Sequence, residues 1–241
     1  SRLGRTRSEI ERLKQANDKL RNSLINRQSA DAELKQLKSV LDLAGTAQYK
    51  VVSAKVISLG STSSFTQTIS IDAGTKLGVR QNMTVISGLG LVGVVKISYP
   101  NHALVQLTTD PAFRVGARVA GSQQIGILSG QGTNKAVLQL LDNQTTLKVG
   151  DVILARGSQN NRPFVPGVPI GAVTSVDNAA GAITQTADVK LYPNFSTLSV
   201  VAVVVGPPKT DPRDVLVPKG PAPTPVPTVT IYATPSESPT P

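Results

Sequence analysis

"FVPGVPIGAVTSV", residues 164–176, echoes "GLGLVGVVKIS", residues 88–98, and this echo decides how the chain folds. Each stretch carries a turn-forming glycine, an apolar pair, a second glycine and a run of small or β-branched residues. The second glycines are Gly93 and Gly171. A glycine inside a strand commonly marks a bend or a close approach that a Cβ atom would block. The echo therefore predicts that Gly93 and Gly171 are equivalent barrel-bend positions in two related units.

The echo extends through a series of short segments. The first series reads "SAKVI", "TISIDAG", "LGVRQNMTVISG", "GLVGVVKIS" and "ALVQLTTD". The second series reads "GARVAG", "AVLQLLDN", "LKVGDVILARG", "VPIGAVTSV" and "TADVKLYPN". Five elements in the same order and at similar spacing indicate an internal duplication. Short alternating strands with glycine turns about 8–12 residues apart are typical of small β-barrels.

The whole chain divides into four regions. We predict a mainly β protein in which an N-terminal coiled-coil helix over residues 1–45 precedes two small six-stranded β-barrels. The first barrel covers residues 50–111 and the second covers 112–206, although the last strand, "TLSVVAVVV", can return to the first barrel. Residues 207–241 are rich in Pro, Ser and Thr, which predicts a disordered tail.

Apolar residues of the helical region follow alternating three- and four-residue steps. These are the a and d positions of a coiled coil, with a polar Asn at one a position, which commonly fixes the register of parallel dimers. The positions are Ile10, Leu13, Asn17, Leu20 and Leu24. Arg27 and Asp31 interrupt the seam, which we expect to resume in a shifted phase, after a stammer, at Leu34, Leu37 and Leu41. The pattern predicts self-association of two or more chains, with a single helix packed on its own domain as the alternative.

Composition restricts the chemistry of this 241-residue chain. With no Cys and one His, it has neither a disulfide framework nor a Cys- or His-cluster metal site, and we expect no metal and no cofactor. The formal net charge of +10 favours an acidic partner, and a basic module that binds an anionic polymer stays open as a function. Only four Tyr and four Phe are scattered along the chain, so stacking on nucleic acid is not expected.

The lone imidazole raises a second alternative, a two-barrel serine-type hydrolase. Such an enzyme would need His102 beside a carboxylate and a serine, with Asp72, Asp110 and Asp151 as the available acids. No glycine-flanked nucleophile elbow is present, and His102 lies in "YPNHAL", which is typical of a turn between strands. We therefore expect no catalytic residues and no enzymatic activity.

Several segments together resemble a known family. They are "AKVI", "ISIDAGTKLGVRQNMTVISGLGLVGVV", "VQLTTDPAFRVGARV", "LKVGDVILARG" and "FVPGVPIGAV". In this combination they are similar to the extracytoplasmic region of the rod shape-determining protein MreC family, over residues 10–206 and without the Pro-rich tail.

The resemblance implies a function that the residues themselves do not show. It implies a single-pass protein of the cell membrane, whose N-terminal transmembrane helix is absent from this chain and whose present region faces the cell wall. It further implies a scaffold of the cell-elongation machinery that self-associates as a homodimer or larger assembly. Its expected partners are a class B penicillin-binding transpeptidase, which it binds and helps to activate, together with MreD, RodA and the actin-like MreB.

Overall fold

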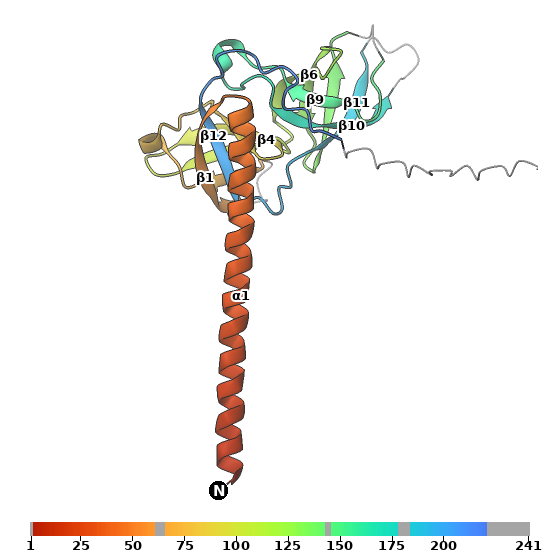
Figure 1. Ribbon diagram of the computed structural model, residues 1–241. Coiled ribbons are helices and arrows are strands. Elements are labelled where there is room, and N and C mark those ends of the chain that lie inside the picture. Colours follow the sequence, from red (N-terminus) through yellow and green to blue (C-terminus); the bar gives the residue numbers. More distant parts are fainter. Residues whose placement is uncertain (1, 61–65, 143–145, 178–183, 221–241) are drawn as a thin grey trace, which may run out of the picture.

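The computed structural model describes residues 2–60, 66–142, 146–177 and 184–220. A long helix, α1 (Arg2–Thr46), forms a stalk that carries a head of two β-barrels (Figure 1). The predicted fold class, a mainly β protein with a helix and two six-stranded barrels, is confirmed. Among the described residues, no helix combines the length and the apolar character that crossing a bilayer requires.

The first barrel, barrel 1, is a closed antiparallel sheet with the strand order β1-β12-β3-β4-β5-β2. Its strands are β1 (Lys50–Leu59), β2 (Thr68–Ile71), β3 (Thr84–Ser87), β4 (Gly90–Ser98), β5 (Ala103–Leu107) and β12 (Val200–Gly206), with a 3-10 turn at Thr75–Leu77. Alternate residues of these strands point inward, and their side chains form the interior core, including Ile69, Ile71, Val85 and Val105.

The second barrel, barrel 2, closes with the order β10-β11-β8-β7-β6-β9. Its strands are β6 (Arg114–Val119), β7 (Ile125–Gly130), β8 (Lys135–Leu140), β9 (Val152–Ala155), β10 (Pro169–Asp177) and β11 (Thr186–Leu191), with a 3-10 turn at Gln159–Asn161. Barrel 2 is thus inserted between β5 and β12 of barrel 1. The last strand returns to the first barrel, where it pairs with β1 and β3.

Strand order corrects one step of the predicted duplication. Going round each barrel, β2, β3, β4 and β5 correspond to β8, β9, β10 and β11, as the two series of segments suggest. The first pair is wrong: "GARVAG" belongs to β6, which stands at the place of β12. The partner of β1 is β7, a strand that the sequence analysis did not identify.

The register places Gly93 and Gly171 at corresponding points. Gly93 faces Val85 on β3 and Leu107 on β5, and Gly171 faces Ile153 on β9 and Leu191 on β11. Both glycines follow directly after a β-bulge, and a second bulge occurs three residues further on in each strand. A Cβ atom at either glycine would collide with a backbone carbonyl oxygen of the next strand.

The two barrels and the base of the helix share one hydrophobic core. It runs from Val40 and Ala44 of α1 through barrel 1 residues such as Ile86 and Leu91 into the interior of barrel 2. At the barrel junction, the rings of Phe113 and Phe164 meet edge to face with centroids 5.5 Å apart. Because this core is continuous, the head is held together by packing as well as by its two chain crossings.

A buried threonine fastens the loop after β9 to barrel 1. The Thr84 hydroxyl donates to the carbonyl of Pro163 at 2.8 Å and accepts from the amide of Val165 at 3.0 Å. Thr84 itself is 1% exposed, so neither bond can be replaced by water. The loop of barrel 2 is therefore fixed on β3 of barrel 1.

Replacing this threonine by valine tests the junction. Thr84→Val keeps the side-chain shape but leaves the Val165 amide without its acceptor, so we expect the free energy of unfolding to fall by about 1–3 kcal/mol. Denaturant unfolding measures the change. Thr174→Val on β10 is the control, since the Thr174 hydroxyl bonds at an exposed position, and should change stability by less than about 0.5 kcal/mol. Equal losses in the two variants would contradict the role given to Thr84.

The segment after β12 differs from the expected tail. Residues 207–220 have no strand, yet they lie against barrel 2 through Asp211 and Asp214, and Leu216 packs on the shared core. The prediction that disorder begins at residue 207 is wrong for this part, because two carboxylates and one leucine give it specific contacts. The remainder of the predicted tail, residues 221–241, lies outside the described residues.

Candidate functional site

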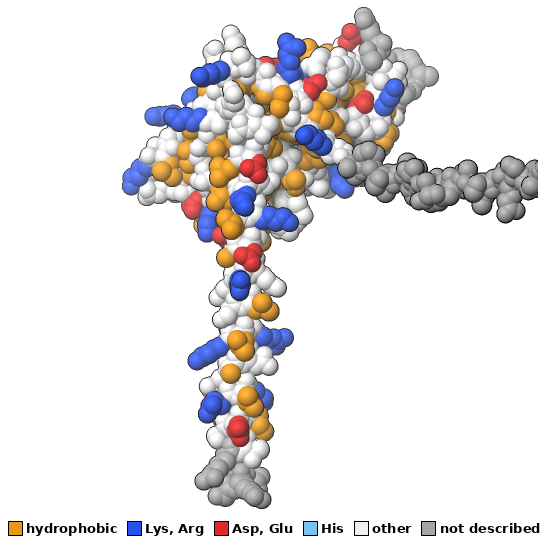
Figure 2. Space-filling model, viewed as in Figure 1, with side chains coloured by type: hydrophobic (Ala, Val, Ile, Leu, Met, Phe, Trp, Pro, Cys, Tyr) orange, Lys and Arg blue, Asp and Glu red, His pale blue; other side chains and the backbone are white. Residues whose placement is uncertain are grey.

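The N-terminal part of the stalk presents an apolar stripe without a partner in the described structure. We call it the helix seam; its residues are Ile10, Leu13, Asn17, Leu20 and Leu24. Its apolar side chains are all half or more exposed, up to 71% for Leu20. Figure 2 shows apolar side chains along the stalk, interspersed with cations and anions. Large exposed apolar residues at a and d spacing are typical of a helix that packs on another helix.

The base of the helix packs on barrel 1 through a different face. Val40 and Ala44 are buried and Leu37 is half-buried against the core. The Gln36 side chain donates to the carbonyl of Thr197 at 2.9 Å and accepts from two backbone amides at the start of β12. At about 100° per residue, this docking face lies roughly opposite the helix seam. The seam is therefore free to receive a partner while the helix stays attached to its own barrel.

The predicted stammer is wrong. Leu24 is an a position, and Leu34 lies ten residues later, which is one heptad plus the three-residue step from a to d. Leu34 is therefore a d position, Leu41 is the next one, and both continue the seam in phase. Both are exposed, like the seam itself. Only Leu37 is out of phase, and it turns toward barrel 1 instead. The structure thus separates Leu37 from the other predicted seam residues and assigns it to the docking face.

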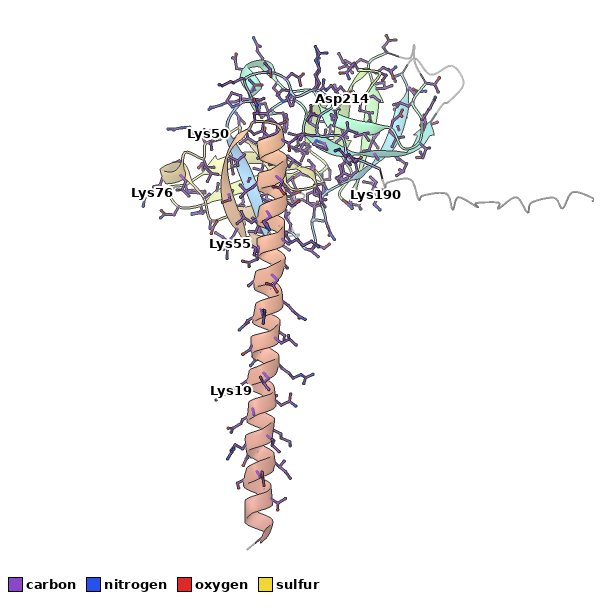
Figure 3. All side chains as sticks on the ribbon, viewed as in Figure 1. Lys19, Lys50, Lys55, Lys76, Lys190 and Asp214 are labelled. Atoms are coloured by element: carbon purple, nitrogen blue, oxygen red, sulfur yellow. The ribbon has the colours of Figure 1, made fainter. Side chains whose placement is uncertain are left out.

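A groove lies between the helix and barrel 1, next to the seam's continuation. It has a volume of about 320 Å³, and its lining includes Ala30, Leu34, Leu37, Ala54 and Val200. At its edge, the Lys55 ammonium lies 2.8 Å from the Glu33 carboxylate, and this hydrogen bond raises the pKa of Lys55. Figure 3 shows Lys55 beside the lower part of the docked helix. The pair is exposed to solvent, so it orients side chains more than it stabilises the fold.

The turn after the helix makes a polar contact with barrel 2. Tyr49 is buried, and its hydroxyl donates to the carbonyl of Pro166 in the loop before β10. Burial raises the pKa of Tyr49 well above its ordinary value, the negative charge of Asp211 raises it further, and Arg118 acts in the opposite direction. The base of the stalk is thereby joined to both barrels, close enough to Asp211 for its charge to act on the phenol.

The Tyr49 contact predicts a dependence of stability on alkaline pH. A phenol whose folded pKa is raised stays protonated in the folded state, while the unfolded chain loses its proton above about pH 10. The contribution of protonated Tyr49 to the free energy of unfolding is therefore fully present below about pH 10. Above that pH the free energy of unfolding falls, by up to about 1.4 kcal/mol per pH unit for this group. Tyr49→Phe should show a shallower fall than wild type in denaturant unfolding at pH 9 to 11 (about one unit on either side of the phenol's ordinary pKa). Tyr99→Phe controls for loss of an exposed phenol, and parallel curves for wild type and Tyr49→Phe would contradict the argument.

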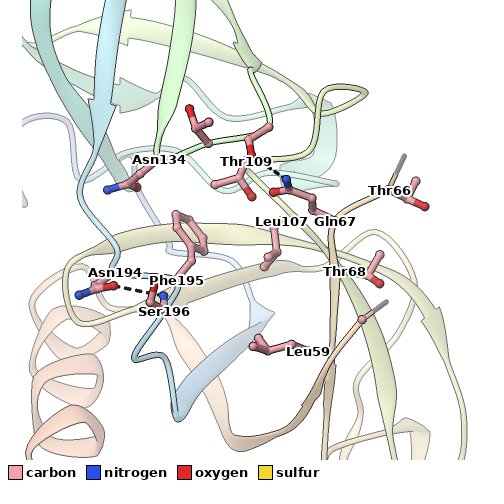
Figure 4. Close-up of a pocket in the computed structure, with 13 residues that line it drawn as sticks. Leu59, Thr66, Gln67, Thr68, Leu107, Thr109, Asn134, Asn194, Phe195 and Ser196 are labelled. Atoms are coloured by element: carbon pink, nitrogen blue, oxygen red, sulfur yellow. Dashed lines mark hydrogen bonds between the residues drawn. The ribbon is translucent and has the colours of Figure 1, made fainter. Parts of the chain in front are cut away.

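A second cleft lies between the two barrels (Figure 4). It has a volume of about 330 Å³ and is lined by residues of both barrels and of the β11–β12 connection. Phe195 and Leu107 form an apolar floor between Asn194 and Gln67, and the side-chain amide of Gln67 donates to the Gly132 carbonyl at 2.7 Å. The buried Thr109 hydroxyl has no hydrogen-bond partner among the described residues. An apolar floor with a few polar groups is the usual composition of a small binding cleft.

The residues considered for hydrolysis are engaged elsewhere. His102 lies in the turn between β4 and β5 with its ring stacked on Tyr99, 4.5 Å between centroids. The carboxylate of Asp72 accepts from the Lys55 amide, that of Asp110 from the amides of Gln67 and Ala112, and that of Asp151 from the Lys148 amide. The three acids thus close turns and strand ends of the backbone.

The charged side chains give no single binding face for an anionic polymer in the view shown. On that side of the molecule, Lys and Arg are spread over the stalk and both barrels and alternate with acidic and apolar residues (Figure 2). Within the described ranges, no group of three or more His, Asp or Glu side chains could hold a metal ion.

The described residues thus form two closed barrels on a helical stalk with an exposed apolar seam, an architecture that can be compared with known proteins. A family model described as "Rod shape-determining protein MreC, barrel core" matches residues 56–205, more than half of the sequence. The chain belongs to the rod shape-determining protein MreC family, as its sequence motifs suggest.

Individual relatives agree with this assignment. The cell shape-determining protein MreC of Listeria monocytogenes is 30% identical over 178 residues, and that of Streptococcus pneumoniae is 28% identical over 178 residues. Each alignment covers 71% of this chain, but only 59% and 65% of the two relatives, respectively. The chain therefore spans less than two thirds of their length.

Solved structures of the family share the fold. A structure described as MreC is 25% identical with a TM-score of 0.65, and covers 73% of this chain and 99% of its own. MreC from Pseudomonas aeruginosa is 26% identical with a TM-score of 0.58, and covers 64% and 99%. A third, 27% identical with a TM-score of 0.54 over 64% and 94%, is described as the major periplasmic domain of the cell shape-determining filament MreC.

Proposed function

We propose that this chain is a non-catalytic scaffold of the cell-elongation machinery, acting outside the membrane. It self-associates through the stalk and binds a peptidoglycan synthase through the head. Family membership supports the role in cell shape, and the description of one solved relative as a periplasmic domain supports the location. The observation that carries the scaffold role is the helix seam, which stays exposed although the opposite face of the same helix is packed.

The geometry of the stalk supports the proposed self-association. A second helix that follows the seam in parallel would meet Leu34 and Leu41 and reach the groove beside barrel 1. In that arrangement Asn17 would face its counterpart, which favours one register. Both heads then lie at the same end of the dimer, as suits a protein anchored at its N-terminus to a single membrane. We propose this anchor together with the partners MreD and RodA on the family resemblance.

The synthase is proposed to be a class B penicillin-binding transpeptidase. Both barrels are closed, so a partner has no free strand edge on which to add a strand. Exposed apolar residues and the clefts remain as contact sites, including Ile57, Leu59 and Ile97 on barrel 1 and Ile127 and Leu141 on barrel 2.

Titration of the full chain with a transpeptidase ectodomain tests this function. We expect binding in the micromolar range or tighter, undiminished in the Leu20→Ala/Leu24→Ala variant, because the head and the seam are separate surfaces. Ile97→Lys on barrel 1 and Ile127→Lys on barrel 2 form a matched pair, since these isoleucines are 45% and 43% exposed. The variant that weakens binding identifies the barrel that carries the contact.

Two outcomes would contradict the proposal. The first is absence of binding at tens of micromolar with both proteins folded. The second is hydrolysis of a peptide or ester that disappears in His102→Ala, which would favour the two-barrel hydrolase. Activation of the synthase is tested separately, as an increase in its transpeptidation rate when the chain is added.

A further inference from the structure

The segment after β12 lies on barrel 2 in a way that defines a binding site. We propose that barrel 2 carries a docking site for an acidic, proline-containing peptide segment of a partner protein, and that residues 211–217 of this chain occupy it as an internal ligand. We call these residues the latch and the surface beneath them the latch site. Figure 3 shows Asp214 of the latch over barrel 2. The inference does not depend on the proposed function.

Arg118 is the first determinant of the latch site. It projects from β6, and its side chain is only 7% exposed. One terminal nitrogen donates to the Gln123 amide oxygen at 2.9 Å and the other lies 3.3 Å from an Asp211 carboxylate oxygen. The Nε atom has no hydrogen-bond partner among the described residues. Because a buried guanidinium without a counter-charge is unfavourable, this position selects a carboxylate.

The turn after β6 supplies a second carboxylate position. The Gly121 amide donates to an Asp214 oxygen at 2.9 Å, and the Gln123 side-chain amide reaches both oxygens of the same carboxylate at 3.1 and 3.2 Å. Gln123 therefore contacts Asp214 through its nitrogen and Arg118 through its oxygen. The two carboxylates are held three residues apart by one continuous set of donors.

Shape selects the residues around the two acids. A Cβ atom at Gly167 would lie 2.5 Å from the Pro212 ring, so this glycine leaves the room that the proline fills. The Arg213 amide donates to the Asp211 carboxylate at 2.7 Å, which turns the latch so that both acids face the barrel. Leu216 then packs on the shared core. The site thus recognises Asp-Pro-x-Asp followed by an apolar residue two positions later.

The latch is held weakly enough to be exchanged. It belongs to neither sheet, and the amides of Val215 and Val217 donate to the carbonyls of Pro212 and Asp214 within the latch itself. Asp211 is 44% exposed, so water competes for its contact. Segments with few buried contacts open at low free energy. A tethered segment has an effective concentration in the millimolar range, so a partner segment must bind more tightly or be concentrated locally to replace it.

Peptide binding to the full chain tests the latch site. The probe is a fluorescent synthetic peptide with the sequence of residues 206–219, measured by anisotropy. Asp211→Ala/Asp214→Ala removes the anchors of the internal ligand, so we expect this variant to bind the peptide about tenfold more tightly than wild type. Asp177→Lys on β10 produces the same change in net charge away from the latch site, and should bind like wild type.

Two further arms separate a specific site from nonspecific attraction. A peptide with Asn in place of both Asp residues should lose most of its binding to the opened variant. Gln123→Glu, added to that variant, keeps an oxygen for Arg118 but repels the second carboxylate, and should abolish binding without unfolding the barrel. The proposal is overturned if opening the latch does not increase affinity, or if the Asn peptide binds as well as the acidic one.

Discussion

Replacing Gly93 or Gly171 by alanine is expected to lower the free energy of unfolding by about 3 kcal/mol or more. The added Cβ atom would overlap the carbonyl oxygen of Gln106 or of Lys190. These oxygens belong to the paired strands of closed barrels, so neither can move aside without breaking ladder hydrogen bonds. Overpacking of this kind typically costs 1–3 kcal/mol, and about 3 or more is expected where the obstacle is backbone.

Gly116 provides the matched control. It lies within β6 of the same barrel as Gly171, and nothing lies within 4 Å of its Cβ position. Gly116→Ala should therefore leave stability within about 0.5 kcal/mol of wild type. Thermal and denaturant unfolding of the three variants decide the matter. If Gly116→Ala lowers the free energy of unfolding as much as Gly171→Ala, the destabilisation is a general effect of replacing glycine in strands. The close approach of backbone at Gly93 and Gly171 would then not be its cause.

Substitution of the helix seam should produce the second large effect, on association instead of stability. In Leu20→Ala/Leu24→Ala, four buried leucines are lost from each proposed dimer. At about 1.5–3 kcal/mol per leucine the loss is about 6 kcal/mol or more, so the dissociation constant should rise by about four orders of magnitude or more. Sedimentation equilibrium measures the change. Both leucines are exposed in the single chain, so its unfolding should be nearly unchanged.

The opposite helix face supplies the control for this experiment. Gln15→Ala/Asn22→Ala changes two exposed polar residues on roughly the far side of the helix from the seam, without changing the net charge. This variant should associate like wild type. Equal association of the seam variant and the control would show that the chains do not meet along the seam.

Local patterns in the sequence were sufficient for the fold class and for most of the duplication. The two-residue alternation of apolar side chains identifies the strands. The glycines of β4 and β10 mark the bulges in these strands, so both signals can be recognised within a single strand. The strand β7 escaped notice for a local reason too. Its inward positions include Gly126 and Gly130, so the usual apolar alternation is missing, although a Cβ atom at either would meet backbone of another segment.

The seam shows where sequence periodicity stops being informative. From Ile10 to Leu24 the apolar side chains follow the heptad and all are exposed, as the proposed pairing with one partner helix requires. Near the barrel, Leu37 and Leu34 are both leucines on one helix, but Leu37 packs on the head and Leu34 does not. Helical spacing gives the angle of each side chain, whereas the neighbour on that side is decided by how the helix meets β12.

The sequence by itself therefore determined most of the elements, four of the five repeated pairs and the spacing of the seam, because these depend on neighbouring residues. The tertiary structure alone decided which strand closes barrel 1, since the pairing of Lys50 with Gly206 joins distant parts of the chain and leaves no local pattern. It also decided the place of the latch. In the sequence, Asp211 and Asp214 belong to a polar tail, whereas in the folded chain they contact Arg118 and Gly121. Closure and docking are long-range contacts, and only the folded chain brings their partners together.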